Sequence, residues 1–179
     1  MKQKIIAIVG QAGSGKDTVA QLMRMTLHVP ILCSSTTRPM REGEVNGREH
    51  IFVKECNIPR EKMLAYTEYG GYKYWTELSQ IKDTAIYVID EKGIMDICER
   101  FPDIELVNIY VAAKPETLKA RGIAPERMKR DEYRVTMDIN SFDYVITNNS
   151  SLYALMQSVI TTSLQITNYS LEKQESSKL

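Results

Sequence analysis

Two hydrophobic patterns alternate along this chain: short continuous apolar runs and longer segments with helical spacing. The apolar runs are rich in β-branched residues, which is typical of buried parallel strands. They lie at residues 5–9, 31–33, 85–89, 106–112 and 144–146. The helical segments lie at residues 16–27, 92–100, 114–121, 125–137 and 152–166. This alternation predicts an α/β fold of the P-loop NTPase type, a parallel sheet with helices on both faces.

Two stretches break the alternation. Residues 34–77 are rich in Thr, Arg, Glu, Gly and Tyr and have little helical period, so we expect a small strand-rich insertion. Residues 169–179 are polar and charged without periodicity, which is typical of a disordered tail. A chain of 179 residues with 43% hydrophobic residues fits one core, so we expect a single domain over residues 1–168.

Charge and cysteine content limit the function classes. Lys+Arg and Asp+Glu both number 23, so no general attraction to a nucleic acid polymer or an anionic membrane is expected. Cys33, Cys56 and Cys98 are far apart without a C-x-x-C pair, which argues against a disulfide framework or a zinc site. No apolar run reaches the ~18 residues of a membrane span, and residues 5–9 are too short for a signal peptide. We expect a cytoplasmic protein.

A glycine-rich segment, GQAGSGK at residues 10–16, lies between the first strand and the first helix and matches G-x-x-x-x-G-K. Its glycines let backbone N–H groups converge on phosphate oxygens, and Lys16 can reach the β and γ phosphates of ATP. A plain glycine turn with a solvated lysine is the alternative, but pattern and context agree. The predicted ATP-binding residues here are Gly10, Gly13, Ser14, Gly15, Lys16, Asp17 and Thr18.

The position after the lysine, usually Ser or Thr, is Asp17, followed by Thr18. Asp17 can ligate Mg²⁺ directly or through water, because magnesium prefers oxygen ligands. Asp17 can equally be an acid stabilised by the helix dipole, with Thr18 serving the metal or packing. The sequence leaves both interpretations open.

Arg38 and Arg41 lie three residues apart among hydroxyl residues and can clamp one phosphate. Taken alone, the spacing favours a solvated basic hairpin. Beyond the glycine-rich loop, however, five ordered segments resemble guanylate kinase motifs, at residues 34–53, 68–76, 87–93, 111–115 and 142–148. With the loop, the resemblance extends from Gly10 to about Leu164.

The resemblance to the guanylate kinase family implies ATP-dependent phosphorylation of a nucleoside monophosphate, GMP or dGMP, with Mg²⁺ as cofactor. It implies that Arg38 and Arg41 hold the acceptor phosphate, that Glu44 supports both arginines and that Tyr74 donates to the same phosphate. A kinase for another nucleotide or small phosphorylated acceptor, and a non-catalytic module that binds a protein partner, are the competing hypotheses. The intact glycine loop argues against the last one.

The same resemblance places Ser34 and Thr76 at the guanine, Asp90 beside the acceptor or the metal shell, and Asn148 at the adenine of ATP. A lid at about residues 114–140 follows. There Arg121 and Arg130 are implied as cations that close over the transferring phosphoryl group, whereas Arg127 and Arg134 can be solvated.

The chain departs from the family at several positions. Ala65 stands where the family has the glutamate that reads the guanine, so base selectivity is in question. Glu68 can take the place of that glutamate only if the local register differs. Glu68 lies three residues after Ala65, and on a strand residues three apart point to opposite faces. His50 replaces a phosphate-binding tyrosine, as a hydrogen-bond donor or as a plain hairpin residue, and Trp75 replaces a glycine beside the base pocket. The lid is also shorter than usual.

Overall fold

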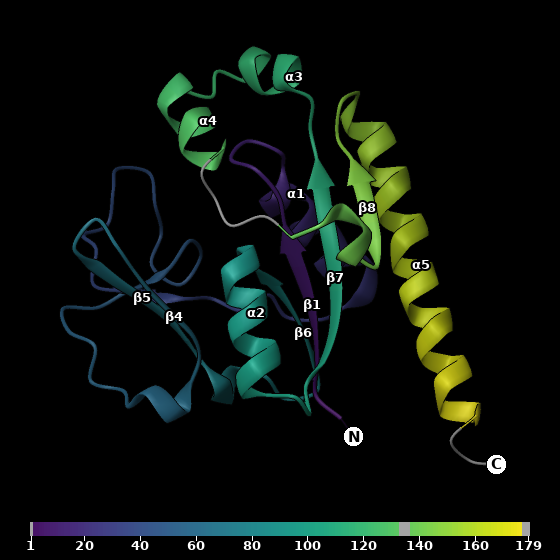
Figure 1. Ribbon diagram of the computed structural model, residues 1–179, viewed down its shortest axis with the longest axis horizontal. Helices are drawn as coiled ribbons and strands as arrows, with labels where there is room; N and C mark the ends of the chain where they lie inside the picture. Colours follow the sequence, from purple (N-terminus) through teal and green to yellow (C-terminus); the bar gives the residue numbers. More distant parts are fainter. Residues whose placement is uncertain (1, 133–136, 177–179) are drawn as a thin grey trace.

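The computed structural model describes residues 2–132 and 137–176, without the side chains of residues 69, 127, 130, 132 and 169–176 (Figure 1). Its centre is a parallel sheet in the order β6-β1-β7-β8. The strands are β1 (Lys4–Val9), β6 (Thr84–Val88), β7 (Glu105–Ala112) and β8 (Tyr144–Thr147). The predicted α/β class with a central parallel sheet is confirmed.

Helices cover both faces of this sheet (Figure 1). On one face, Ile6 and Ile8 of β1 pack with Met23 of α1 (Lys16–Leu27) and Val159 of α5 (Leu152–Ser176). On the other face, residues 5, 7 and 9 pack with α2 (Glu91–Arg100). Burial of each large aliphatic side chain contributes about 1.5–3 kcal/mol, so β1 is held from both sides. The lid region contains α3 (Pro115–Ala120), α4 (Pro125–Glu132) and the turn η3 (Ile139–Ser141).

Two predicted boundaries are wrong. Residues 31–33 form one bridge, Ile31 with Ile86, instead of a strand. Pro30 has no N–H to donate, and the backbone of Cys33 is bonded to the side chain of Gln80, so pairing with β6 stops there. The helix α5 also continues to Ser176, through most of the segment for which we predicted disorder. No proline or glycine interrupts residues 152–176, and the end of this segment is rich in Leu, Glu, Lys and Gln, which favour helix.

Residues 34–77 form the predicted strand-rich insertion. Its sheet has the order β3-β2-β5-β4 and lies beside α2 in Figure 1. The strands are β2 (Ser35–Thr36), β3 (Ile51–Phe52), β4 (Met63–Tyr69) and β5 (Tyr72–Glu77), with short turns η1 (Arg60–Lys62) and η2 (Leu78–Gln80). Among the described residues, no helix is both long and apolar enough to cross a membrane.

An ion pair fixes the loop between β2 and β3. Both terminal nitrogens of Arg38 donate to the carboxylate of Glu44, at 3.0 and 2.8 Å, and the Arg41 backbone N–H donates to the same carboxylate at 2.7 Å. These hydrogen bonds lower the pKa of Glu44 to about 2, chiefly through Arg38. Arg38 also donates to the Pro39 carbonyl at 2.8 Å and lies over the Phe52 ring. The pair therefore orders the loop that carries Arg41.

This pair predicts an acid-dependent contribution to stability. The ordinary pKa of Glu44 is 4.5, and the folded value is lower, so its stabilisation is complete above pH 4.5 and is lost as the pH falls toward 2. Thermal unfolding from pH 2 to 7 should show a melting-temperature gap between the wild type and Glu44→Gln that narrows below pH 4.5. Glu42→Gln, at an exposed neighbouring acid, is the control. A gap independent of pH would contradict the assignment.

Candidate functional site

The glycine-rich loop connects the end of β1 to the start of α1, as predicted. Gly15 has φ of 98°, a left-handed conformation that L side chains rarely adopt. A Cβ at Gly10 would lie 2.4 Å from the Val111 carbonyl oxygen, so that position also requires glycine. No side chain caps α1, which leaves its first-turn N–H groups available to an anion.

The loop carbonyls are bonded from the β7 and β8 side of the sheet. Arg121, just after α3, donates to the carbonyls of Gly13 at 2.9 Å and Ser14 at 3.3 Å. Asn148, just after β8, donates its side-chain amide to the Ser14 carbonyl at 2.8 Å and accepts from Arg121 through its backbone oxygen at 3.0 Å. Because the carbonyls are bonded from this side, the loop can present its N–H groups to phosphate.

Arg121, which we expected over the transferring phosphoryl group, and Asn148, which we expected at the adenine, both hydrogen-bond the loop backbone. Both also line the cavity beside the loop. The side chains of Arg127 and Arg130, and the whole of Arg134, are outside the described residues.

Asp131 of α4 also contacts the loop, which the sequence analysis missed. Its carboxylate is buried and accepts from the Ala12 backbone N–H at 2.7 Å. The two residues are 119 positions apart, so no local pattern could have revealed the contact. It joins the lid helix to the loop.

A cavity of about 370 Å³ opens beside this loop. Lys16, Asp17 and Thr18 line it from the loop and α1, and Asp17 and Thr18 are exposed. The Lys16 ammonium donates to the Gln11 carbonyl at 2.9 Å within the loop. Among the described residues no cluster of three or more His, Cys, Asp or Glu could hold a metal. The exposed carboxylate and hydroxyl oxygens of Asp17 and Thr18 fit Mg²⁺, which needs only one or two protein ligands beside nucleotide phosphates and water.

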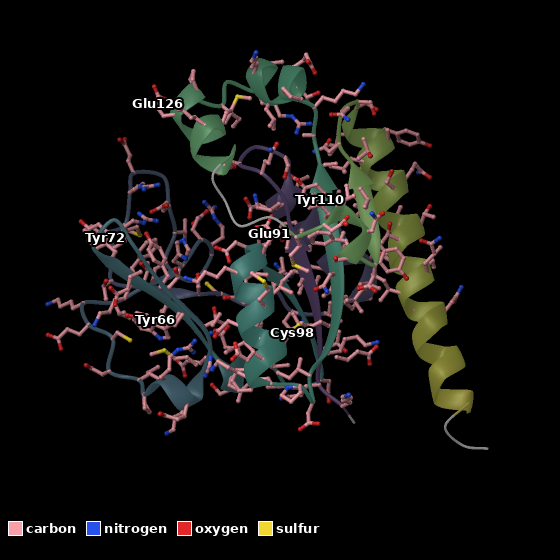
Figure 2. The ribbon with its side chains drawn as sticks, in the orientation of Figure 1. Tyr66, Tyr72, Glu91, Cys98, Tyr110 and Glu126 are labelled. Carbon is pink, nitrogen blue, oxygen red and sulfur yellow. The ribbon has the colours of Figure 1, made fainter. Side chains whose placement is uncertain are left out.

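A second cavity, of about 390 Å³, lies between the insertion and α2. Figure 2 shows Tyr66 on the insertion side of this region, with Glu91 at the start of α2 across from it. Ser34, Ala65, Tyr74, Tyr87 and Asp90 are among the lining residues. Asp90 caps α2 by accepting from the Gly93 N–H at 2.8 Å. The cavity follows the carboxyl end of β6, the neighbour of β1, so both cavities lie at the same edge of the sheet.

The paired arginines differ in their surroundings. Arg38 is buried and bonded to Glu44, whose predicted support of both arginines matches the observed contacts. The Arg41 side chain is exposed and makes no hydrogen bond or ion pair with any residue that the structure describes. The hydroxyl of Tyr74 contributes to raising the pKa of Arg38, after the larger effect of Glu44. Arg41 is therefore the arginine free to bind an anion.

His50 accompanies Ser34 and Tyr74. Its Nδ1 lies 2.7 Å from the Ser34 hydroxyl, and its ring packs edge-on against Tyr74 at 5.6 Å between centroids. Burial, and next the charge of Arg38, lower the pKa of His50 below 6.5, so the ring is neutral at pH 7. A neutral ring can still donate one hydrogen bond.

Thr76 is fully buried, and it is not among the residues that line the cavity. Its hydroxyl lies 2.7 Å from the hydroxyl of Tyr87, which does line the cavity. Ala65 pairs with Thr76 across β4 and β5 and reaches the same cavity. Thr76, which we expected at the guanine, thus lies behind the cavity wall, and Tyr87, which the sequence analysis did not single out, lines the cavity.

Comparison with known proteins adds independent information. A family model described as guanylate kinase matches residues 2–161. The guanylate kinase of Halalkalibacterium halodurans is 29% identical over 166 residues, covering 83% of this chain and 81% of that protein. The guanylate kinase of Prochlorococcus marinus is 27% identical over 168 residues, covering 83% of this chain and 91% of that protein. The crystal structure of guanylate kinase from Anaplasma phagocytophilum superposes with a TM-score of 0.58 at 18% identity, covering 97% of this chain and 88% of that one. The last likeness supports the fold alone.

Proposed function

The chain belongs to the guanylate kinase family, and from that premise we propose that it transfers the γ-phosphoryl group of ATP to the phosphate of GMP. One observation carries the proposal: the glycine-rich loop and the strand-rich insertion border two cavities at the carboxyl edge of adjacent parallel strands. Two substrates bound there approach from separate parts of the chain. Such an arrangement suits transfer between two phosphates.

The phosphate loop holds the donor in this proposal. Its outward N–H groups and the start of α1 bind the β and γ phosphates of ATP, and Lys16 compensates their charge. Asp17 and Thr18 would hold Mg²⁺, which when bound neutralises charge on the same phosphates. Arg121 and Asn148 act by keeping the loop backbone in position.

The insertion holds the acceptor. Arg41 binds the GMP phosphate, with Arg38, Glu44 and Tyr74 ordering the surrounding surface. Ser34 and His50 are joined by a hydrogen bond, and we assign them to the same substrate. The acceptor phosphate oxygen is already anionic, so no general base is needed. Arg130 completes the proposal as a lid cation over the phosphoryl group.

We place the enzyme in the cytoplasm. ATP and nucleoside monophosphates are abundant there, and its three cysteines are free thiols, as in reducing compartments. The proposed partners are the two nucleotides.

The first test of the proposal concerns Lys16. Replacing it with methionine removes the charge that faces the phosphates while keeping the side-chain length, so Lys16→Met should lower kcat for GDP formation by at least about a hundredfold. The melting temperature should stay near that of the wild type. Lys82→Met, at an exposed turn, is the matched control and should keep full activity. An active Lys16→Met enzyme would remove the donor assignment.

A second test separates the two substrates. Arg41→Met should raise the KM for GMP about tenfold or more, because a charge-assisted contact to the acceptor phosphate is lost. The KM for ATP should change less than about twofold. Arg48→Met, an exposed arginine of the same insertion, is the control. An equal rise in the KM for ATP would place Arg41 at the donor instead.

A third test concerns Ala65, which reaches the acceptor cavity without a polar group. Ala65→Glu should place a carboxylate near the guanine N1–H and amino group and raise kcat/KM for GMP by roughly tenfold to a hundredfold, about 1.4–3 kcal/mol. The decisive quantity is the ratio of kcat/KM for GMP to that for AMP in both proteins. An unchanged ratio in a folded variant would mean that another residue already reads the base.

A further inference from the structure

Ala65 and Tyr87 line the acceptor cavity, and Asp90 and Lys92 are among its charged lining residues. The Tyr87 hydroxyl lies 2.7 Å from that of Thr76, and Thr76 pairs with Ala65 across the β4–β5 ladder. Thr76 is fully buried, whereas Tyr87 lines the cavity. Of the two hydroxyl residues, Tyr87 is therefore the one that a bound base can meet.

The hydrogen bond between the two hydroxyls can run in either direction. Each hydroxyl has one proton and can also accept, and either atom can be the donor in this pair. If Thr76 donates, the Tyr87 proton remains free to be donated to a carbonyl oxygen in the cavity. If Tyr87 donates to Thr76, its oxygen can accept from an amino group. A rotation of two hydroxyl protons converts one arrangement into the other, with no movement of heavy atoms.

The phenol stays protonated throughout the physiological range. Burial raises the pKa of Tyr87 to about 12, and the nearby negative charge of Asp90 acts in the same direction. The group therefore works as a neutral donor or acceptor, and it cannot reject a carbonyl oxygen as a fixed carboxylate would. A side chain that can only accept, or only donate, a hydrogen bond discriminates strongly against a base that presents the same kind of group. A rotatable hydroxyl can do either and does not discriminate in this way.

Building on the proposed transfer to a nucleoside monophosphate, we infer that Tyr87 is the base-facing residue of the acceptor cavity, and that the enzyme phosphorylates both 6-oxo and 6-amino purine nucleotides. The small side chain of Ala65 and the reversible hydroxyl pair are the basis of this tolerance. The 2-amino group of guanine is then a secondary determinant. The inference extends the proposed function from GMP to a wider class of acceptors.

The test measures kcat and KM for GMP, IMP and AMP with saturating ATP, in the wild type and in three variants. IMP and AMP both lack a 2-amino group and differ at the 6 position and at N1, which carries a proton only in IMP, so their comparison tests whether the cavity distinguishes 6-oxo from 6-amino purines. In the wild type, kcat/KM for IMP and AMP should agree within about tenfold. Tyr87→Phe should raise the KM for both by about threefold to tenfold and leave the KM for ATP unchanged, because one hydrogen bond is lost from each complex.

Two further variants separate base reading from a structural hydrogen bond. Thr76→Val removes the same hydrogen bond from the protein but keeps the Tyr87 hydroxyl, so acceptor KM values should stay within about threefold of the wild type. Tyr153→Phe, at an exposed tyrosine of α5, should change nothing. If Tyr87→Phe and Thr76→Val lower the melting temperature alike and neither changes an acceptor KM, the pair is structural and the inference is wrong.

A wild-type preference of more than about a hundredfold for IMP over AMP would also overturn the inference while leaving GMP phosphorylation intact. Failure to form a diphosphate from any of the three acceptors would overturn the kinase assignment itself. The two failures are therefore distinguishable in the same experiment.

Discussion

The hydrogen bonds that hold the carbonyls of the phosphate loop are the constraint on which the site depends. A loop that turns its N–H groups toward an anion must satisfy its carbonyl groups elsewhere, because buried unpaired carbonyls are costly. Here Arg121 and Asn148 supply those hydrogen bonds, and they follow β7 and β8 respectively. In the order β6-β1-β7-β8, β7 is the neighbour of β1 and β8 is the neighbour of β7, and the segments that follow β7 and β8 reach the loop at the end of β1. The parallel sheet thus does more than bury apolar surface, because its strand order brings the supports of the loop together.

The insertion beside the acceptor cavity is ordered partly by polar contacts between its own side chains. The insertion contributes Leu64 and Ala65 to the core on one face of the sheet, and polar contacts such as the Arg38–Glu44 pair order its loop. That pair occupies one of the two arginines expected to bind phosphate and leaves the other exposed. Arg38 therefore orders the loop through Glu44 instead of presenting its guanidinium to an anion. The lid contacts the donor loop through Asp131, whose carboxylate accepts from the Ala12 backbone N–H.

Local patterns predicted those parts of the fold that depend on neighbouring residues. The apolar run of β1, the glycines and the spacing of α1 identified the phosphate loop, because each element there is determined within a few residues. The resemblance to family motifs located the insertion and Arg41. Contacts between distant residues could not be read in this way: Asp131 with Ala12, Thr76 with Tyr87 and Arg121 with the loop carbonyls join segments that carry no shared periodicity. The neutral state of His50 likewise depends on burial that arises only in the folded protein.

In the proposed reaction the two cavities act together in one phosphoryl transfer. Incubation of the full chain with GMP and ATP labelled in the γ-phosphate, followed by separation of the products, tests this most directly. Labelled GDP should form in a one-to-one ratio with ADP, and little labelled inorganic phosphate should form as long as GMP is present. ADP formed with labelled inorganic phosphate alone would show that water, rather than a nucleotide in the second cavity, accepts the phosphoryl group, and this would contradict the account.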